Sequence, residues 1–220
     1  MDAINYIVET ILKLRQNRTL LIAFDGADTS GKTTLANSVH TVLKSHKFDS
    51  IRVSMDKFYH AREKRFARGE LSPEGFFYDS TNYDAVFRCV IFPVKESLGY
   101  ILPGVYDYRS EKPIEPDKIR IDSRSIVLID GKFMNRDELC TYWDLSVFLE
   151  VAFDTIIERA LIRDLELFGT REEVLSRYVN RYIPSEQLYM EKCNPAERAS
   201  IVIDNDDYRN PRVIKEYVPS

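Results

Sequence analysis

Cysteine, histidine and long apolar runs are all scarce in this chain. It has only three cysteines and three histidines among 220 residues. The cysteines are odd in number and share no C-x-x-C spacing, which argues against a disulfide framework or zinc knuckle and favours free thiols in a reducing compartment. The histidines are too scattered for a metal cluster, and no window approaches the roughly 18 apolar residues of a membrane span. We therefore expect a cytoplasmic protein with no membrane partner.

An excess of charge of one sign is also absent. Lys plus Arg number 31 and Asp plus Glu number 35, so the net charge of −4 creates no overall positive field that would attract nucleic acid. Residues 2–16 have helical apolar spacing, but Asp2 and Glu9 interrupt any export-signal core. There is no internal repeat or linker composition. At roughly 150 residues per domain, the length predicts a single domain over residues 1–220.

The chain does contain a regular alternation of apolar runs and amphipathic segments. Five runs are typical of strands that are covered on both faces: 19–24, 50–55, 125–129, 145–151 and 200–203. Helical patterns occupy 33–45, 84–92, 136–142, 154–167 and 171–191. This alternation predicts an α/β fold with a doubly wound, parallel five-stranded sheet and flanking helices. In such folds ligands bind beyond the carboxyl ends of the strands.

Two irregular stretches interrupt the alternation. Residues 57–83 are rich in arginine, glycine and aromatics, and residues 99–122 contain three prolines among short apolar pieces, which predicts a small β-hairpin arm. Long irregular segments inside compact domains are usually functional. We expect both to shape a substrate site, and we expect a helical lid at about 160–175. The basic stretch 62–68 and most arginines of 154–182 are interpreted as solvated, with the role of Arg171 left open.

A complete phosphate-binding loop follows the first predicted strand. Residues 26–34 (GADTSGKTT) match the pattern G-x-x-x-x-G-K-[ST]. The glycines let backbone amides turn toward phosphate oxygens, and the next helix adds its positive N-terminal end. Lys32 supplies a mobile charge for the β- and γ-phosphates, and Thr33 supplies a hydroxyl for Mg²⁺. The predicted nucleotide site consists of Gly26, Ala27, Asp28, Thr29, Ser30, Gly31, Lys32, Thr33 and Thr34.

Two aspartates stand at the ends of predicted strands. Asp130 follows the run 125–129, where a P-loop protein needs a second magnesium support, although an Asp-Gly turn would also explain it. Asp56 ends the run 50–55, where a carboxylate can orient an acceptor hydroxyl and take its proton; a loop cap is the alternative. We expect the strand before Asp56 to pair with the strand that feeds the phosphate loop, so that both open on one crevice.

Other nucleotide-binding classes fit less well. A GTPase switch would need an N-K-x-D tetrad and an ABC-type ATPase an L-S-G-G-Q segment, and neither occurs. A regulatory protein that binds nucleotide without turnover remains an alternative. The presence of Lys32, Asp56 and Asp130 together favours an enzyme.

Taken together, these motifs resemble the uridine kinase family of P-loop kinases. The resemblance covers most of residues 19–205 and depends on the phosphate loop, D-x-F-Y at 56–59, PGVYDY at 103–108, I-D-G at 129–131 and R-D at 163–164. It implies a phosphotransferase that uses ATP and Mg²⁺ to phosphorylate the 5′-hydroxyl of a nucleoside such as uridine or cytidine. By position it implies a general base at Asp56, a lid arginine at Arg163, a magnesium carboxylate at Asp130, and substrate contacts by Tyr59, Asp79 and Tyr106.

The resemblance is weaker in the part that would recognise the base. Nucleoside kinases of this family place a histidine a few residues after Y-D-F to contact the pyrimidine, whereas Glu111 stands near that place here. The F-D-H-P element is replaced by YDSTN at 78–82, and the paired lid arginines by FGTR at 168–171. A pantothenate-like, ribosyl-nicotinamide-like or sugar-phosphate acceptor therefore stays open, as does a homo-oligomeric state.

Overall fold

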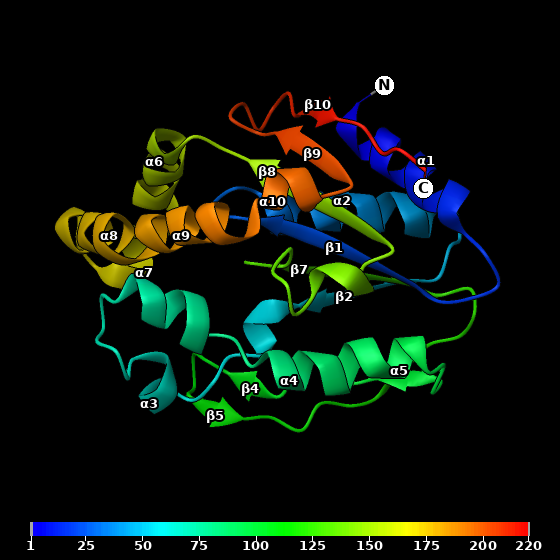
Figure 1. Cartoon of the computed structure of the whole chain (residues 1–220), viewed down its shortest axis with the longest axis horizontal. Coiled ribbons are helices and arrows are strands. Elements are labelled where there is room, and N and C mark those ends of the chain that lie inside the picture. The colour runs from blue at the N-terminus through cyan, green and yellow to red at the C-terminus, as the bar shows by residue number, and fades with distance from the viewer. Residues whose placement is uncertain (1, 220) are drawn as a thin grey trace.

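A six-stranded sheet forms the centre of the computed structural model, which describes residues 2–219 (Figure 1). Its order is β10-β9-β8-β1-β7-β2. The five strands that the sequence predicts are present and mutually parallel. Their bounds are β1 Leu20–Gly26, β2 Ser50–Ser54, β7 Ile126–Gly131, β8 Leu145–Glu150 and β9 Ile201–Asp204.

The sixth strand was not predicted. β10 (Arg212–Lys215) lies antiparallel to β9 at the edge of the sheet. It alternates exposed and half-buried residues and carries two basic side chains, so it lacks the continuous apolar run of a central strand. Only Val213 packs against the core.

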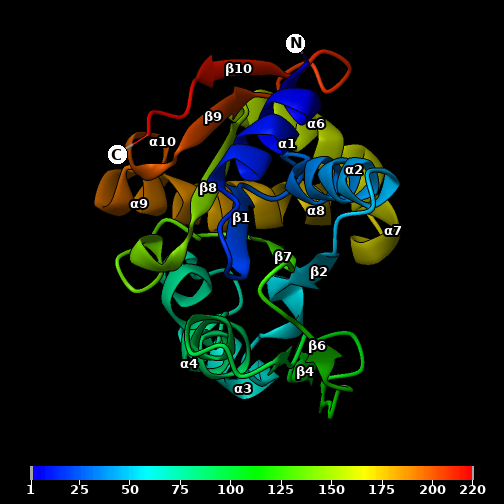
Figure 2. The same cartoon turned by 90° about the vertical axis from the view of Figure 1, so that its right-hand side faces the viewer.

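Helices cover both faces of this sheet (Figure 2). On one face, α1 (Ala3–Leu14) and α2 (Lys32–Ser45) pack against alternate residues of β1, such as Leu20 and Ile22. On the other, a helical segment made of α4 (Tyr83–Val86), η3 (Phe87–Ile91) and α5 (Phe92–Lys95) buries Leu21 and Ala23. Burial on both faces explains why β1 and β7 begin with continuous apolar runs, Leu20–Phe24 and Ile126–Ile129.

The C-terminal half supplies the helices beside the phosphate loop. They are α6 (Phe153–Arg163), α7 (Leu165–Phe168), α8 (Arg171–Arg177), η5 (Tyr178–Tyr182), α9 (Ile183–Cys193) and α10 (Pro195–Arg198).

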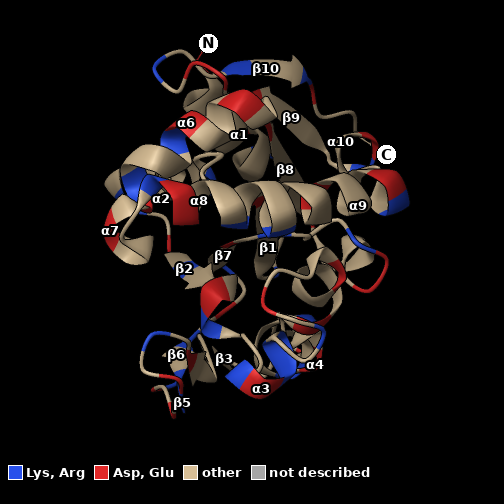
Figure 3. Ribbon diagram, turned by 90° about the vertical axis from the view of Figure 1, so that its left-hand side faces the viewer, with Lys and Arg blue, Asp and Glu red and all other residues tan. Residues whose placement is uncertain are grey.

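Acidic and basic residues are interspersed along the ribbon (Figure 3), and Arg177 pairs with Glu173 one turn away at 2.8 Å. None of the helices described between residues 2 and 219 is long and apolar enough to cross a bilayer.

The predicted arm consists of two small antiparallel pairs. β3 (Tyr100–Ile101) pairs with β6 (Ile119–Arg120), and β4 (Tyr106–Asp107) pairs with β5 (Lys112–Pro113). The backbone of Val105 donates to the carbonyl of Lys57 at 2.8 Å. This bond attaches the arm to η1 (Met55–Lys57), the short turn that follows β2. The preceding irregular stretch holds two further short helices, α3 (Arg62–Arg65) and η2 (Gly75–Asp79).

Two expectations about the fold are wrong. The predicted helix at 136–142 is only a turn, η4 (Cys140–Tyr142), at its end. Just before it, the backbone amide of Asn135 donates to side-chain oxygens of Asp25 and Tyr189. These tertiary hydrogen bonds hold the backbone in an irregular conformation at the point where a helix was predicted to begin. The strand before Asp56 also does not pair with β1. β7 lies between them and pairs with both.

Candidate active site

The phosphate loop has the backbone of an anion cradle. Gly26 has φ +151°, and a Cβ there would lie 3.0 Å from the carbonyl oxygen of Leu149. Gly31 has φ +95°, and a Cβ there would lie 2.7 Å from Nδ2 of Asn205. The loop ends in the N-terminus of the 14-residue helix α2. The glycines of the pattern are thus required by conformation and by close neighbours, and the amides and helix end fit a phosphate chain.

Asp28 stands between two lysines within this loop. Its Oδ1 lies 3.9 Å from Nζ of Lys32, and its two oxygens lie 3.5 and 3.4 Å from Nζ of Lys132. Lys32 also donates to the carbonyl of Ala27 at 3.1 Å. Burial by itself would raise the pKa of Asp28, but the charges of Lys132, Lys32 and Arg163 lower that pKa to about 2. The carboxylate is therefore ionised and holds two ammonium groups at the mouth of the loop.

Thr33 and Asp130 form a candidate magnesium site. Thr33 Oγ1 donates to Oδ2 of Asp130 at 2.5 Å, because β7 lies directly beside β1 in the sheet. Both side chains offer the oxygen ligands that Mg²⁺ prefers, with phosphate oxygens and water to complete the shell. The residues present therefore fit the ion that the motifs imply.

Arg52 is a member of this group that we did not predict. Its Nη2 donates to Oδ1 of Asp130 at 2.6 Å, and its Nε donates to Oδ1 of Asn37 at 3.0 Å. The available signal was an arginine between the apolar residues Ile51 and Val53 of a predicted strand. A cavity of about 400 Å³ opens here, and the arm residues Pro103, Ile114 and Pro116 are part of its lining.

Asp56 lies one strand farther from the loop than expected but remains connected to it. The carboxylate is exposed on η1, and Oδ1 accepts a hydrogen bond from the Tyr59 hydroxyl at 3.0 Å. Lys132 in turn donates to the Tyr59 oxygen at 2.8 Å. Burial raises the pKa of Tyr59 well above its ordinary value, and the Asp56 charge raises it further, so the phenol stays protonated. A chain of contacts thus runs from Lys32 through Asp28, Lys132 and Tyr59 to Asp56.

The predicted substrate residues Tyr59 and Tyr106 lie in one cluster. The Tyr106 hydroxyl donates to Oε2 of Glu111 at 3.0 Å, and Nη2 of Arg65 contacts Oε1 at 2.5 Å. The Arg65 guanidinium lies 5.5 Å from the centre of the Tyr59 ring. Arg65 is buried, so our interpretation of the stretch 62–68 as solvated is wrong at this position. The missed signal was Phe66, the aromatic residue next to Arg65, whose ring lies 5.3 Å from the Arg65 guanidinium.

The third predicted substrate residue, Asp79, has a different partner. It ends η2, and its Oδ2 accepts from Nε of Arg68 at 2.6 Å. Among residues 2–219 its side chain makes no hydrogen bond to Tyr59 or Tyr106. The backbone nevertheless keeps it near the cluster, because Tyr59 and Thr81 form an antiparallel bridge. Its role in substrate binding stays a prediction.

Arg163 ends α6 and faces the loop from the lid side. Its guanidinium donates to both oxygens of Asp164 at 2.6 and 2.8 Å and to the Tyr178 hydroxyl at 3.2 Å. Its charge also acts on Asp28. The predicted lid, 160–175, spans the end of α6, α7 and the start of α8; lid motion and a role for exposed Arg171 stay predictions.

Other lid-side arginines are not solvated as expected. Arg159 donates to the backbone carbonyls of Thr29 and Asn205, at 3.4 and 2.7 Å, and so supports the phosphate loop directly. Arg181 is only 2% exposed and donates to carbonyls of the segment 65–70. The glutamates between these arginines in the sequence had suggested ion pairs at the surface. In the folded protein, Arg159 and Arg181 instead point inward and bind backbone carbonyls.

A buried acidic pair lies behind the loop. Asp25 is fully buried and accepts from the Tyr189 hydroxyl at 2.5 Å and from Nδ2 of Asn135 at 2.8 Å. Glu186 on α9 is also buried, and its Oε1 has no hydrogen-bond partner among residues 2–219. Burial, together with the charges of Asp28 and Asp25, raises the pKa of Glu186 to about 8. The folded chain therefore favours the neutral form of this side chain.

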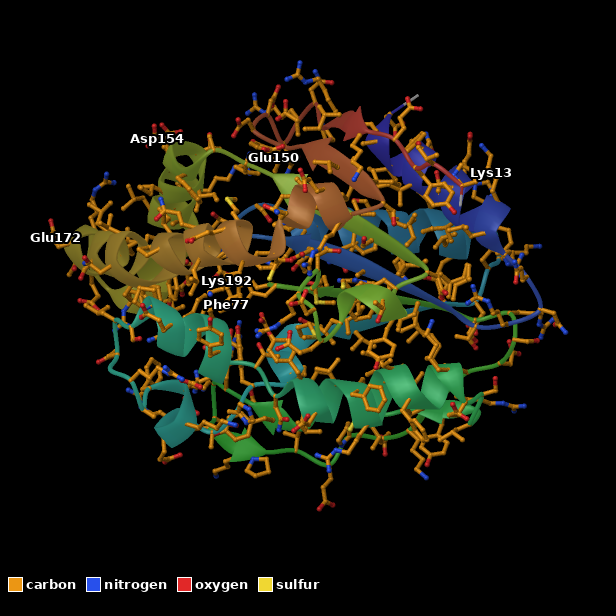
Figure 4. The ribbon with its side chains drawn as sticks, viewed as in Figure 1. Lys13, Phe77, Glu150, Asp154, Glu172 and Lys192 are labelled. Atoms are coloured by element: carbon orange, nitrogen blue, oxygen red, sulfur yellow. The ribbon has the colours of Figure 1, made fainter. Side chains whose placement is uncertain are left out.

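Replacing Glu186 by glutamine is expected to stabilise the protein at alkaline pH. Between pH 4.5 and 8 the unfolded chain ionises this carboxyl while the folded chain keeps it protonated, so its contribution to stability falls as the pH rises. We therefore expect the free energy of unfolding of Glu186→Gln, relative to that of wild type, to increase by about 2–4 kcal/mol from pH 5 to pH 8. Urea unfolding at both values measures this. The control is Glu172→Gln, at an exposed site on α8 (Figure 4), and an equal gain at both pH values would contradict the prediction.

Comparisons with known proteins find similar sequences over most of this chain. The family model described as Phosphoribulokinase / Uridine kinase family matches residues 21–207. A uridine kinase from Brevibacillus brevis is 26% identical over 199 residues, covering 86% of each chain. One from Bacillus mycoides is 27% identical over 189 residues, covering 80% of this chain and 81% of the relative.

Solved structures share the fold. A possible uridine kinase from Bacillus stearothermophilus superposes with a TM-score of 0.71 at 23% identity, covering 90% of this chain and 96% of the other. Phosphoribulokinase from Rhodobacter spheroides has a TM-score of 0.57 at 14% identity, covering 86% and 71%. At these identities the structural likeness establishes the α/β architecture alone.

Proposed function

The chain belongs to the phosphoribulokinase / uridine kinase family, and from this premise we propose that it is an ATP- and Mg²⁺-dependent kinase for a hydroxyl group of a small molecule. The first candidate acceptor is a pyrimidine nucleoside such as uridine or cytidine, since the relatives named above are uridine kinases. The observation that best supports the proposal is the chain of contacts from Lys32 to Asp56. It joins a phosphate loop to a free carboxylate at the carboxyl edge of one sheet.

The proposed reaction is an in-line phosphoryl transfer. The acceptor oxygen forms a bond to the γ-phosphorus as its proton passes to a carboxylate oxygen of Asp56. The bond from the γ-phosphorus to the β,γ-bridging oxygen breaks, and its electron pair leaves with ADP. Lys32 follows the charge on the β- and γ-oxygens, and Arg163 is placed to add a second cation from the lid side.

Thr33 and Asp130 are the residues that would hold Mg²⁺. When bound, the ion would neutralise charge on the β- and γ-phosphates. Arg52 shares the Asp130 carboxylate and orients it toward Thr33. Arg52 binds Oδ1 of Asp130, so Oδ2 points toward Thr33 of the phosphate loop.

The acceptor pocket that we propose is polar. Tyr59, which contacts Asp56, forms a cluster with Arg65, Glu111 and Tyr106 that offers hydrogen-bond donors and one carboxylate. Such a lining suits an acceptor with several hydroxyl or amide groups. Because Glu111 is paired with Arg65 where nucleoside kinases of the family use a histidine, the other acceptors considered above belong in any test.

The direct test is an acceptor screen with coupled detection of ADP. Purified protein, ATP and Mg²⁺ would be incubated with pyrimidine nucleosides, purine nucleosides, pantothenate, nicotinamide riboside and sugar phosphates. We expect one acceptor class to raise ADP release clearly above the rate without acceptor, and mass spectrometry to find the phosphorylated product. Nucleotide binding without turnover on any acceptor would instead favour the regulatory alternative.

Asp130→Asn is expected to weaken the magnesium dependence more than nucleotide affinity. The change removes a carboxylate charge from the proposed metal shell while the loop amides remain in place. The magnesium concentration for half-maximal activity should rise by about tenfold, the effect of roughly 1.4 kcal/mol. Magnesium titration of the rate, with Asp154→Asn on the exposed side of α6 as control (Figure 4), measures it. An unchanged titration would leave Asp130 with a structural role alone, as the strand residue that binds Arg52 and Thr33.

A further inference from the structure

Lys132 is a buried lysine that neither the motifs nor the family resemblance singled out. It follows β7 directly, two residues after Asp130, and is 8% exposed. Its Nζ lies 4.5 Å from the centre of the Phe76 ring, so one side of the ammonium group is shielded by an aromatic face. A buried charge of this kind needs partners, because isolated ammonium groups are costly to remove from water.

The partners of Lys132 divide between the two halves of the site. On the nucleotide side it lies 3.4 and 3.5 Å from the oxygens of Asp28. On the acceptor side it donates to the Tyr59 hydroxyl at 2.8 Å, and this hydroxyl donates to Asp56. The ammonium therefore stands between the phosphate loop and the candidate base.

Lys132 and Lys32 have the same carboxylate as their ion-pair partner. Among residues 2–219, Asp28 is the only carboxylate within 4 Å of Lys132, and its Oδ1 also lies within 4 Å of Lys32. Two ammonium groups thus share one anion at the mouth of a loop built for phosphate. A terminal phosphoryl group that contacts Lys32 would bring further negative charge beside Asp28, and like-charge repulsion would weaken the hold of Asp28 on its two cations.

We infer that Lys132 is a second phosphoryl-binding lysine, which contacts an oxygen of the γ-phosphoryl group and bridges it to the acceptor side through Tyr59. The inference rests on the proposed function and adds a residue to its machinery. Lys132 would act on the terminal phosphoryl group, while Lys32 spans the β- and γ-positions. A cation that reaches the group in transfer stabilises the charge spread over its oxygens, as an arginine finger does.

A purely structural role for Lys132 makes a different prediction. If it only held Asp28 and Tyr59 in place, its loss would affect all nucleotides alike through the shape of the loop. Contact with the γ-phosphoryl group instead singles out nucleotides that carry one. The comparison of a triphosphate with a diphosphate therefore separates the two roles.

The experiment measures the affinities of ADP and of the β,γ-imido analogue of ATP, both with Mg²⁺, by calorimetry. We expect Lys132→Met to weaken binding of the analogue by about 10- to 100-fold, the loss of one charge-assisted hydrogen bond, and to change ADP binding by less than about threefold. Lys132→Arg, which keeps the charge, should recover most of the loss. Lys192→Met, at an exposed position on α9 (Figure 4), is the matched control and should resemble wild type.

An unchanged ratio of the two affinities in Lys132→Met would overturn the inference, as would an equal loss for both nucleotides. Lys132→Gln, which keeps a donor for Tyr59 without the charge, repeats the test should the methionine variant not fold. A wild-type chain that binds neither nucleotide would remove the proposed function and this inference with it. A wild type that binds both, with a ratio indifferent to Lys132, would leave the proposed function standing and remove the inference alone.

Discussion

Asp56→Asn is expected to lower kcat by about 10²–10⁴-fold, the usual contribution of a positioned general base. The amide is nearly isosteric, and its oxygen can still accept the hydrogen bond from Tyr59 that now reaches Oδ1 at 3.0 Å. The acceptor can therefore still dock. The amide cannot take the hydroxyl proton, so the loss should fall on the chemical step.

Steady-state kinetics with the acceptor found by the screen, combined with ATP binding, would check this separation. Nucleotide affinity should stay within a few-fold of wild type, because Asp56 contacts the phosphate loop only through Tyr59 and Lys132. Asp154→Asn, an exposed aspartate on α6, is the matched control. Activity within a few-fold of wild type at saturating acceptor would mean that the base lies elsewhere and that Asp56 is a loop cap.

Lys32→Ala is expected to reduce kcat/KM by at least about 10²-fold, the typical cost of removing one preorganised electrostatic partner of the transition state. Lys32 is 9% exposed and lies at the N-terminus of α2, with its Nζ held by the Ala27 carbonyl and near Asp28. No other residue of the loop 26–34 carries a positive charge. Lys132 approaches from the neighbouring strand and reaches a different part of the phosphate chain in our proposal.

The measurement is kcat/KM for ATP with the variant's fold verified by circular dichroism. Lys13→Ala, at an exposed position of α1 (Figure 4), controls for the general loss of a positive charge. Near-normal activity in folded Lys32→Ala would refute the assignment of residues 26–34 as the site of ATP turnover.

Much of the fold could be predicted from the sequence because the deciding signals are local. A strand buried on both faces needs an uninterrupted apolar run, and β1 and β7 have it. The phosphate loop is a contiguous stretch whose glycines are required by its own backbone. The parallel sheet, its five parallel strands and the position of the candidate phosphate loop could therefore be predicted from the sequence alone.

What the sequence could not decide is which distant residues meet. The insertion of β7 between β1 and β2 places Asp130 beside Thr33 and leaves Asp56 one strand away. Nothing local in the chain encodes that order, because backbone hydrogen bonds between parallel strands are alike for every pair.

The polar side chains of the site show the same division. Lys132, Arg65 and Arg52 have no motif of their own, and a lysine or arginine in a charged stretch is usually solvated. Their partners lie far away in the chain: Asp28 for Lys132, Glu111 for Arg65 and Asp130 for Arg52. A buried charge is costly unless it has a partner of opposite charge, and which residues are buried depends on the packing of the whole molecule. The motifs therefore located the candidate phosphate loop, whereas tertiary packing decided which charges surround it.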